Sequence, residues 1–293
     1  MNLEGTFTAI VTPFHEDGSI DYDSFARLIE DQIKAGISGI VVLGTTGESP
    51  TISPEEHNRV IKFAIEKAAK RTLVIAGTGS NSTDEAIEYS VKAKEDGADA
   101  LLLVSPYYNK PTQKGLYEHF KKIADSVDLP QIIYNIKGRT AVNVETDTLM
   151  KLAEHKNIVA VKEASGDISQ MMDVLMRAPK DFTVISGDDN ITFPLMCLGG
   201  KGVISVVSNI VPADVIVMVN AVLRGDFDEA RKKHFELLPL MKACFIETNP
   251  IPIKTMLAMQ GKIKESFRLP MCAMEAGNKE KLRSIFSRYQ SRK

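Results

Sequence analysis

The chain has 293 residues, of which 44% are hydrophobic and 25% are charged, with a formal net charge of −2. These proportions are typical of a globular enzyme or binding protein, and the small net charge excludes the basic surface that nucleic-acid binding needs. No apolar segment reaches the ~20 residues of a membrane span, and residues 1–5 lack the features of a signal peptide, so we expect no membrane partner. The three cysteines are odd in number and widely spaced, which indicates a reducing compartment and hence the cytoplasm.

Short apolar runs rich in Val, Ile and Leu alternate with longer amphipathic segments along most of the chain. Continuous apolar runs are typical of parallel strands that are covered on both faces. The predicted strands cover residues 7–12, 39–43, 73–77, 100–104, 131–135, 158–162, 183–186 and 202–207. The predicted helices follow them at 22–35, 54–70, 83–96, 113–127, 146–155, 168–177, 191–198 and 213–223.

Start and stop signals agree with these elements. Ser53 and Pro54 precede acidic residues at one predicted helix start, and Gly97 lies where a helix should end. Eight strand–helix units in alternation predict an α/β fold, a (β/α)8 TIM barrel, over residues 1–224. Residues 225–293 change to a helix-only pattern and predict a small C-terminal helical region, with helices at 227–245, 253–260 and 279–289.

Polar side chains follow several of the predicted strands. In a barrel of this kind, the residues that carry chemistry lie at the C-terminal ends of the strands, so these side chains should meet at one mouth. They are Thr45, Thr46, Tyr107, Tyr108, Tyr134, Lys162 and, just beyond the fifth strand, Arg139.

Lys162 ends an apolar run, where a cation costs free energy unless something requires it. Burial lowers a lysine pKa, and a neutral amine can attack a ketone to form an imine and then an enamine. A tyrosine–threonine chain can move the protons, while the Thr45 and Thr46 backbone N–H groups and the Arg139 fork can each hold a carboxylate. These residues predict a keto-acid donor that is joined to an acidic carbonyl acceptor.

Structural roles remain as alternatives. Lys162 could pair with Glu163 or another carboxylate, and Tyr134 could be a core aromatic. Residues 44–47 could simply be a tight turn, and Arg139 could be a solvated loop cation. The whole chain could also be a silent barrel that binds a small acid. We expect no cofactor and no metal site, because the five histidines lack ligand spacing and no dinucleotide or phosphate-loop motif is present. That absence also disfavours a metal-dependent aldolase.

Six motifs resemble the 4-hydroxy-tetrahydrodipicolinate synthase (dihydrodipicolinate synthase) family, within the superfamily of pyruvate-dependent class I aldolases that includes N-acetylneuraminate lyase. They arrive in the family's order over essentially the whole chain, and the arginine favours the synthase over the lyase. The motifs are Gly44-Thr45-Thr46-Gly47-Glu48, Pro106-Tyr107-Tyr108-Asn109, Tyr134-Asn135, Gly138-Arg139-Thr140, Val161-Lys162-Glu163-Ala164-Ser165-Gly166 and Asn249-Pro250-Ile251-Pro252.

The resemblance implies a lyase that condenses pyruvate with L-aspartate 4-semialdehyde through a Schiff base. This is the first committed step of diaminopimelate and lysine biosynthesis. Lys162 would form the imine, and Tyr134, Thr45 and Tyr108 would relay protons. Tyr108 would reach into the neighbouring subunit, which implies a homodimer at least and a homotetramer, a dimer of dimers, as the usual assembly.

The resemblance also implies binding residues. Thr46 would hold the pyruvate carboxylate, Arg139 would hold that of the semialdehyde, and Gly187 and Ile204 would line the pocket. Relatives are often inhibited by lysine at the dimer interface, and the matching positions are Ser49, His57, Asn81, Glu85 and Tyr107.

The chain departs from the family at four positions. Pro50 and Pro54 replace an alanine and a histidine of lysine-sensitive relatives, so lysine inhibition stays open. Lys137 and Ala141 stand where proline and glycine are usual. Loss of the proline removes a φ constraint, so these two changes are expected to loosen the Arg139 loop or to alter the acceptor preference.

Overall fold

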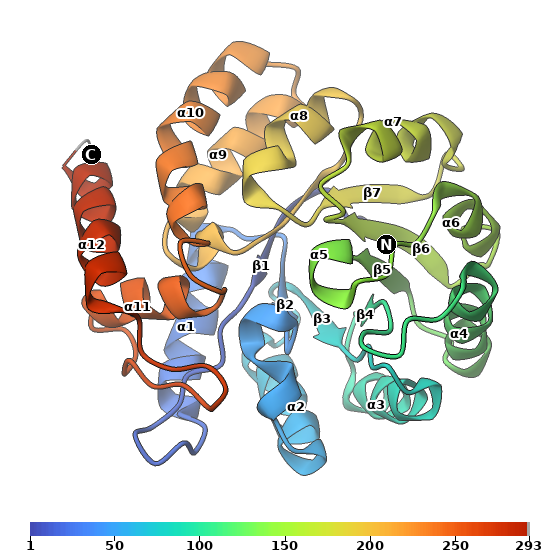
Figure 1. Ribbon diagram of the computed structural model, residues 1–293, viewed down its shortest axis with the longest axis horizontal. Helices are drawn as coiled ribbons and strands as arrows, with labels where there is room; N and C mark the ends of the chain where they lie inside the picture. The colour runs from blue at the N-terminus through green and yellow to red at the C-terminus, as the bar shows by residue number, and fades with distance from the viewer. Residues whose placement is uncertain (292–293) are drawn as a thin grey trace.

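The computed structural model describes residues 1–291, so residues 292 and 293 of the predicted C-terminal region lie outside the described residues. Eight parallel strands close into a barrel in the order β1 to β8, with helices around the outside (Figure 1). The predicted (β/α)8 barrel is therefore confirmed. The strands are β1 (Gly5–Ala9), β2 (Gly39–Val42), β3 (Leu73–Gly77), β4 (Ala100–Val104), β5 (Gln131–Asn135), β6 (Ile158–Glu163), β7 (Thr183–Ser186) and β8 (Gly202–Ser205).

Each strand leads to an outer helix, and three more helices follow the barrel. The outer helices are α1 (Tyr22–Ala35), α2 (Pro54–Ala68), α3 (Thr83–Asp96), α4 (Gln113–Ser126), α6 (Thr146–Leu152), α7 (Ile168–Arg177), α8 (Thr192–Cys197) and α9 (Pro212–Leu223). The C-terminal helices are α10 (Phe227–Ala243), α11 (Ile251–Met259) and α12 (Ala276–Gln290), which lie along one side of the barrel in Figure 1. A short helix, α5 (Lys137–Thr140), follows β5.

The first and last strands differ from their predicted bounds. β1 begins two residues early because Gly5 and Thr6 pair with β8, at Gly202 and Val203. β8 ends at Ser205 because the chain turns into a 3₁₀ segment over Val207–Asn209. The start of β1 depends on pairing with a distant strand, and the N–H groups of Val206 and Val207 after β8 donate to Asp189. The local apolar pattern does not indicate either contact.

The core consists of two groups of buried side chains, one on each face of the barrel wall. The inner group fills the barrel and includes Phe7, Ile75, Ile132 and Ile204, and the larger outer group lies between strands and helices. This arrangement explains why the strands are apolar on both faces. Tyr134 belongs to the inner group, so it lies at the floor of the barrel mouth.

Two features of the described chain bear on function. Within residues 1–291, no helix has the length and apolar character that a membrane span requires. Over the same residues, no group of three or more His, Cys, Asp and Glu side chains is arranged to hold a metal ion.

Candidate active site

Lys162 and Tyr134 lie side by side at the ends of β6 and β5, where their Cα atoms are paired in the sheet register. The Lys162 Nζ atom is 3.9 Å from the centre of the Tyr134 ring. Their exposed fractions are 6% and 4%, so both side chains are shielded from water. The alternative pairing of Lys162 with Glu163 is wrong, because Glu163 instead accepts hydrogen bonds from the Ser165 N–H and the Asn135 amide.

The surroundings of Lys162 favour the neutral amine. Burial lowers its pKa to about 7; Asp189 opposes this shift, and Arg139 adds to it. A buried ammonium is poorly solvated, so the side chain gives up its proton more readily than in water. Near neutral pH, a large fraction of Lys162 is therefore an unprotonated nucleophile.

Tyr134 keeps its proton under the same conditions. Burial raises its pKa to about 12, while Arg139 and a hydrogen bond with Thr45 act in the opposite direction. Thr45 begins the 3₁₀ turn η1 (Thr45–Gly47) directly after β2, which brings it over the barrel mouth. A protonated phenol in contact with a threonine hydroxyl can pass a proton in either direction. Three of the predicted residues thus meet in one place.

Gly187 leaves room for the lysine side chain. A Cβ atom at this position would lie 3.0 Å from both Cγ and Cε of Lys162, and 2.8 Å from the Ala164 Cβ. Those approaches are too close for carbon atoms, so only glycine fits without displacing the lysine. Ile204 lies on β8 with an exposed fraction of 1% and shares the inner core with Tyr134.

Asp189 follows β7 and was not among the site residues predicted from the sequence. Its Oδ2 atom accepts hydrogen bonds from the N–H groups of Val206 and Val207, each at 2.9 Å. Burial raises the Asp189 pKa to about 6, and its charge is the main influence that opposes deprotonation of Lys162. Its position directly after a barrel strand was the signal that could have identified it.

Asn249 connects two of the predicted binding residues and had no predicted role beyond its motif. Its Nδ2 atom donates to the Thr46 Oγ1 atom at 3.0 Å, and its backbone oxygen accepts from the Arg139 Nη2 atom at 3.1 Å. The segment before α11 therefore closes one side of the barrel mouth. No local pattern indicates this contact, because the partners are remote in the sequence.

A buried ion pair holds the same loop. The Lys254 Nζ atom lies 2.5 Å from Glu48 Oε1, and the side chains are 0% and 2% exposed. The ammonium also lies 4.2 Å from the centre of the Phe14 ring. Sequence reasoning did not find this pair, although both residues belong to or follow the quoted motifs. Its effect is to fasten the turn that carries Thr45 and Thr46 to α11.

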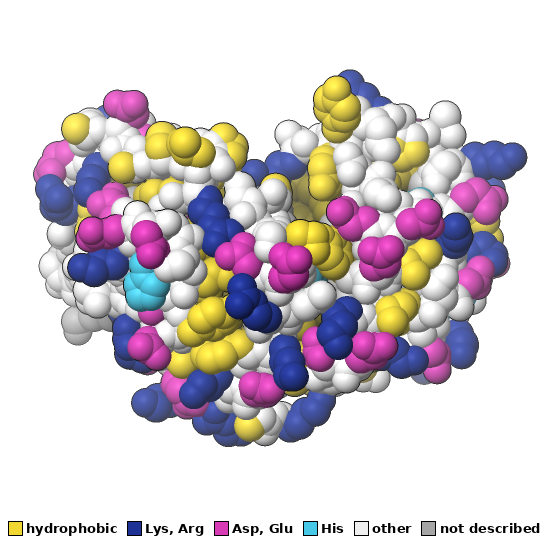
Figure 2. All heavy atoms as spheres, turned by 90° about the horizontal axis from the view of Figure 1, so that it is seen from below, with side chains coloured by type: hydrophobic (Ala, Val, Ile, Leu, Met, Phe, Trp, Pro, Cys, Tyr) yellow, Lys and Arg dark blue, Asp and Glu magenta, His cyan; other side chains and the backbone are white. Residues whose placement is uncertain are grey.

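A cavity of about 600 Å³ opens beside these residues. It is lined by Thr45 and Arg139 and by four of the five residues of the implied lysine site: Ser49, His57, Glu85 and Tyr107. The fifth, Asn81, donates from Nδ2 to the Tyr107 backbone oxygen at 3.2 Å instead. Figure 2 shows the surface hollowed between the C-terminal helices and the side that carries α3 and α4.

Tyr108 is not brought to the other relay residues within this chain. Its side chain is 90% exposed, and its φ of 72° lies in the left-handed region. Such exposure of a tyrosine is compatible with the expectation that it reaches a second subunit.

The Arg139 loop retains a defined structure despite Lys137 and Ala141. Ala141 adopts a φ of 58° at the end of α5, a conformation that glycine adopts at lower cost. The Thr140 Oγ1 atom nevertheless donates to the Ile136 oxygen at 3.0 Å, and Arg139 is bound to Asn249. These contacts hold the loop in place in this structure, and the effect of Lys137 and Ala141 on its mobility or on the acceptor preference stays a prediction.

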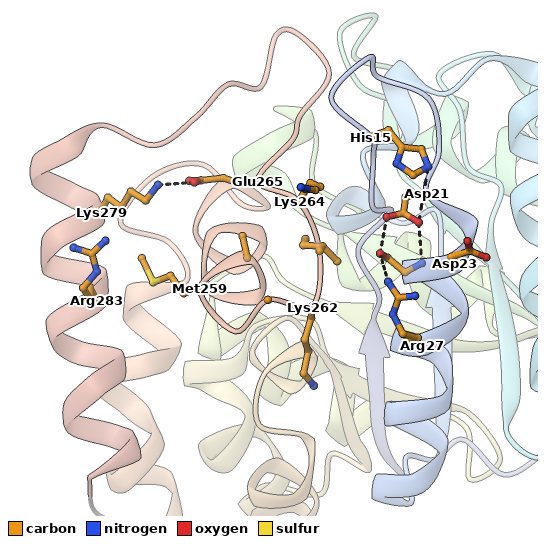
Figure 3. Close-up of a pocket in the computed structure, with 14 residues that line it drawn as sticks. His15, Asp21, Asp23, Arg27, Met259, Lys262, Lys264, Glu265, Lys279 and Arg283 are labelled. Atoms are coloured by element: carbon orange, nitrogen blue, oxygen red, sulfur yellow. Dashed lines mark hydrogen bonds and ion pairs between the residues drawn. The ribbon is translucent and has the colours of Figure 1, made fainter.

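A larger groove of about 770 Å³ lies elsewhere, between α1 and the C-terminal helices. Figure 3 shows His15 and Asp21 on one wall and Lys279 and Arg283 on the other. Several of its charged groups are already engaged, as in the Lys279–Glu265 ion pair. None of the predicted site residues lines it, so size alone does not identify the active site.

Comparisons with known proteins agree with this geometry. The model of the Dihydrodipicolinate synthetase family matches residues 2–289. A 4-hydroxy-tetrahydrodipicolinate synthase of Endomicrobium trichonymphae is 54% identical over 281 residues, which covers 96% of each chain.

Two of the similar solved structures are complexes with a small molecule. A dihydrodipicolinate synthase from Acinetobacter baumannii, complexed with pyruvate, is 44% identical with a TM-score of 0.97 and 99% coverage of both chains. One from Cyanidioschyzon merolae with lysine bound is 39% identical with a TM-score of 0.96 and 98% coverage of both chains. The buried lysine, its tyrosine neighbour and these full-length matches lead to one conclusion: the chain belongs to the dihydrodipicolinate synthetase family.

Proposed function

We propose that this chain condenses pyruvate with L-aspartate 4-semialdehyde to give 4-hydroxy-tetrahydrodipicolinate, the first committed step of diaminopimelate and lysine biosynthesis. The observation that carries the proposal is the buried Lys162 amine, with a pKa of about 7, against the Tyr134 ring. The relative from Endomicrobium trichonymphae bears the name of this synthase, which supports the same activity.

In the first half of the reaction, the Lys162 Nζ atom attacks the C2 carbonyl of pyruvate and forms a C–N bond. The carbonyl oxygen takes up two protons, which Tyr134 relays from the Lys162 nitrogen, and it leaves as water as the C=N bond of the imine forms. Removal of a methyl proton then gives the enamine. Tyr134 and Thr45, which share a hydrogen bond, carry these protons, and the partner subunit's Tyr108 completes the relay.

In the second half, the enamine carbon attacks the aldehyde carbon of the semialdehyde and forms the new C–C bond, and the aldehyde oxygen takes up a proton from the relay to become the 4-hydroxyl group. The amino group of the acceptor then attacks the imine carbon, closes the ring and releases Lys162 for another cycle. Arg139 binds the acceptor carboxylate, and Thr46 binds that of pyruvate. Gly187 and Ile204 shape the pocket around the imine.

The assembly follows from Tyr108. Its 90% exposed side chain supports a role in the partner's site, with a homodimer as the minimum unit and a homotetramer as the full assembly. Residues 1–224 form the catalytic barrel, and the described part of residues 225–293, which ends at residue 291, forms the helical region that braces its mouth. The three cysteines are all free, which supports a location in the cytoplasm.

The cavity beside the barrel mouth binds lysine as an inhibitor. The Cyanidioschyzon merolae structure with lysine bound supports this, as does the shared lining by Ser49, Glu85 and Tyr107. Glu85 can pair with an ammonium group, and burial lowers the pKa of His57. Pro50 and Pro54 line the same cavity, so the affinity will differ from that of relatives with alanine and histidine there.

The deciding experiment is borohydride reduction in the presence of pyruvate, followed by mass spectrometry. The expected result is a stable pyruvate adduct on Lys162, together with turnover when aspartate 4-semialdehyde is supplied. An unmodified Lys162, or a Lys162→Ala variant that still forms product, contradicts the proposal. Turnover of pyruvate with a sugar aldehyde, but not with aspartate 4-semialdehyde, would indicate an activity like that of N-acetylneuraminate lyase instead.

A further inference from the structure

Asn249 lies between the two residues that bind the substrate carboxylates in the proposed function. Asn249 is 3% exposed, so bulk water does not compete for its hydrogen bonds. The Nδ2 atom donates to Thr46 Oγ1 at 3.0 Å, and the backbone oxygen accepts from Arg139 Nη2 at 3.1 Å. One residue of the C-terminal region thus contacts both binding groups.

The direction of the first hydrogen bond determines what Thr46 can do. A threonine hydroxyl has one proton to donate and two lone pairs that accept. The Asn249 amide occupies a lone pair, and Thr46 makes no other side-chain hydrogen bond among residues 1–291. The hydroxyl proton is therefore available to a further acceptor, and a carboxylate accepts such a hydrogen bond strongly.

The position of Asn249 is braced from both sides. Lys254, five residues further on, forms the buried ion pair with Glu48, which lies two residues after Thr46. The turn that carries Thr46 is thus joined to the segment around α11 at two points. Asn249 cannot move relative to Thr46 without disturbing a buried charge pair, which is costly.

We propose that Asn249 is a positioning residue: its side chain sets the Thr46 hydroxyl as a donor for the pyruvate carboxylate, and its carbonyl places Arg139 for the second substrate. This inference rests on the proposed function. The side chain of Asn249 then affects pyruvate through Thr46, and its backbone carbonyl affects the second substrate through Arg139.

The test compares Asn249→Asp with Asn249→Ala. Aspartate has nearly the same shape but only accepts, so it would take the Thr46 proton and place a negative charge near the pyruvate carboxylate. The half-saturating pyruvate concentration, measured by borohydride trapping on Lys162, should rise about tenfold or more in Asn249→Asp and about threefold in Asn249→Ala. The KM for aspartate 4-semialdehyde should stay within about twofold in Asn249→Ala, because the carbonyl remains.

Two controls separate this role from a structural one. Asn220→Asp makes the same chemical change on the exposed side of α9 and should leave both substrates unaffected. In a Thr46→Val background, Asn249→Ala should have no further effect on pyruvate, because the hydroxyl that it orients is absent. This cycle also decides the matter if Asn249→Asp fails to fold.

Wild-type pyruvate saturation in Asn249→Ala, or equal effects of that variant with and without the Thr46 hydroxyl, would overturn the inference. So would an equal rise in both KM values together with a lower melting temperature. Failure of the proposed function is distinguishable, because the unaltered enzyme would then form no pyruvate adduct, and the inference would fall with it.

Discussion

Lys162 and Tyr134 occupy paired positions on adjacent strands, so the lysine nitrogen is held 3.9 Å above the centre of the phenol ring. An aromatic ring can attract a cation, but burial lowers the Lys162 pKa to about 7. The nucleophile and the proton carrier are therefore fixed against each other by the sheet register.

The first prediction concerns pH. Because only the neutral amine attacks pyruvate and the Lys162 pKa is about 7, the rate of imine formation should rise as pH increases through 7 and then level off. Arg139 lowers this pKa, so Arg139→Ala should move the midpoint to higher pH. Rapid borohydride quenching across the pH range measures both midpoints. A flat profile, or a midpoint unchanged in the variant, would contradict the argument.

The second prediction concerns Tyr134→Phe. Burial raises the Tyr134 pKa to about 12, so the hydroxyl is protonated at neutral pH, and its removal takes away a proton carrier but little volume. The kcat should fall by about 10²–10⁴, with a melting temperature close to that of the wild type. Steady-state kinetics and thermal unfolding provide the measurements. Activity within about tenfold of the wild type would exclude a relay through this residue.

The third prediction tests the space at Gly187. In Gly187→Ala, the new methyl group would lie 3.0 Å from the Lys162 Cε atom and displace the amine. Adduct formation with pyruvate should fall about 10²-fold, because small misplacements of a reacting group are costly. The matched control is Gly277→Ala in α12, where a Cβ meets no atom within 4 Å. Equal trapping by both variants would show that Lys162 adapts.

The fourth prediction concerns the Glu48–Lys254 ion pair. Lys254→Met leaves the Glu48 carboxylate buried without its partner, which should cost about 3–5 kcal/mol in the free energy of unfolding. The double variant Glu48→Gln with Lys254→Met removes both charges and should recover part of that loss. Denaturant unfolding measures the difference. Additive losses in the double variant would mean that the pair is not coupled.

The fifth prediction tests whether Tyr108 acts in a partner's site. Tyr108→Phe and Lys162→Ala should each be poorly active alone. When the two are refolded together, each mixed dimer contains one site with an intact Lys162 and an intact Tyr108 from the partner. Activity should therefore reappear on mixing, and the proportion of mixed dimers can be measured by native mass spectrometry. No recovery in confirmed mixed dimers would place Tyr108 in its own subunit's site or outside the reaction.

Much of the site followed from the sequence because the residues lie at strand ends. Lys162, Tyr134 and Thr45 were expected together, and the structure places Lys162 and Thr45 in contact with Tyr134. Only the resemblance to the family suggested that one site contains Ser49, His57, Asn81, Glu85 and Tyr107. Asn81 does not line the cavity that Ser49, His57, Glu85 and Tyr107 share, and the role of Tyr108 in a second subunit stays a prediction.

The sequence by itself determined the alternation of strands and helices, and with it the barrel and the edge at which its polar residues gather. The local periodicity of apolar residues predicts these features, because a buried strand and an amphipathic helix each need a particular spacing of apolar residues. Only the tertiary structure decided that Asn249 contacts Thr46 and Arg139, and that Lys254 pairs with Glu48. Such contacts depend on how distant segments approach each other in space, and no short stretch of sequence contains that information.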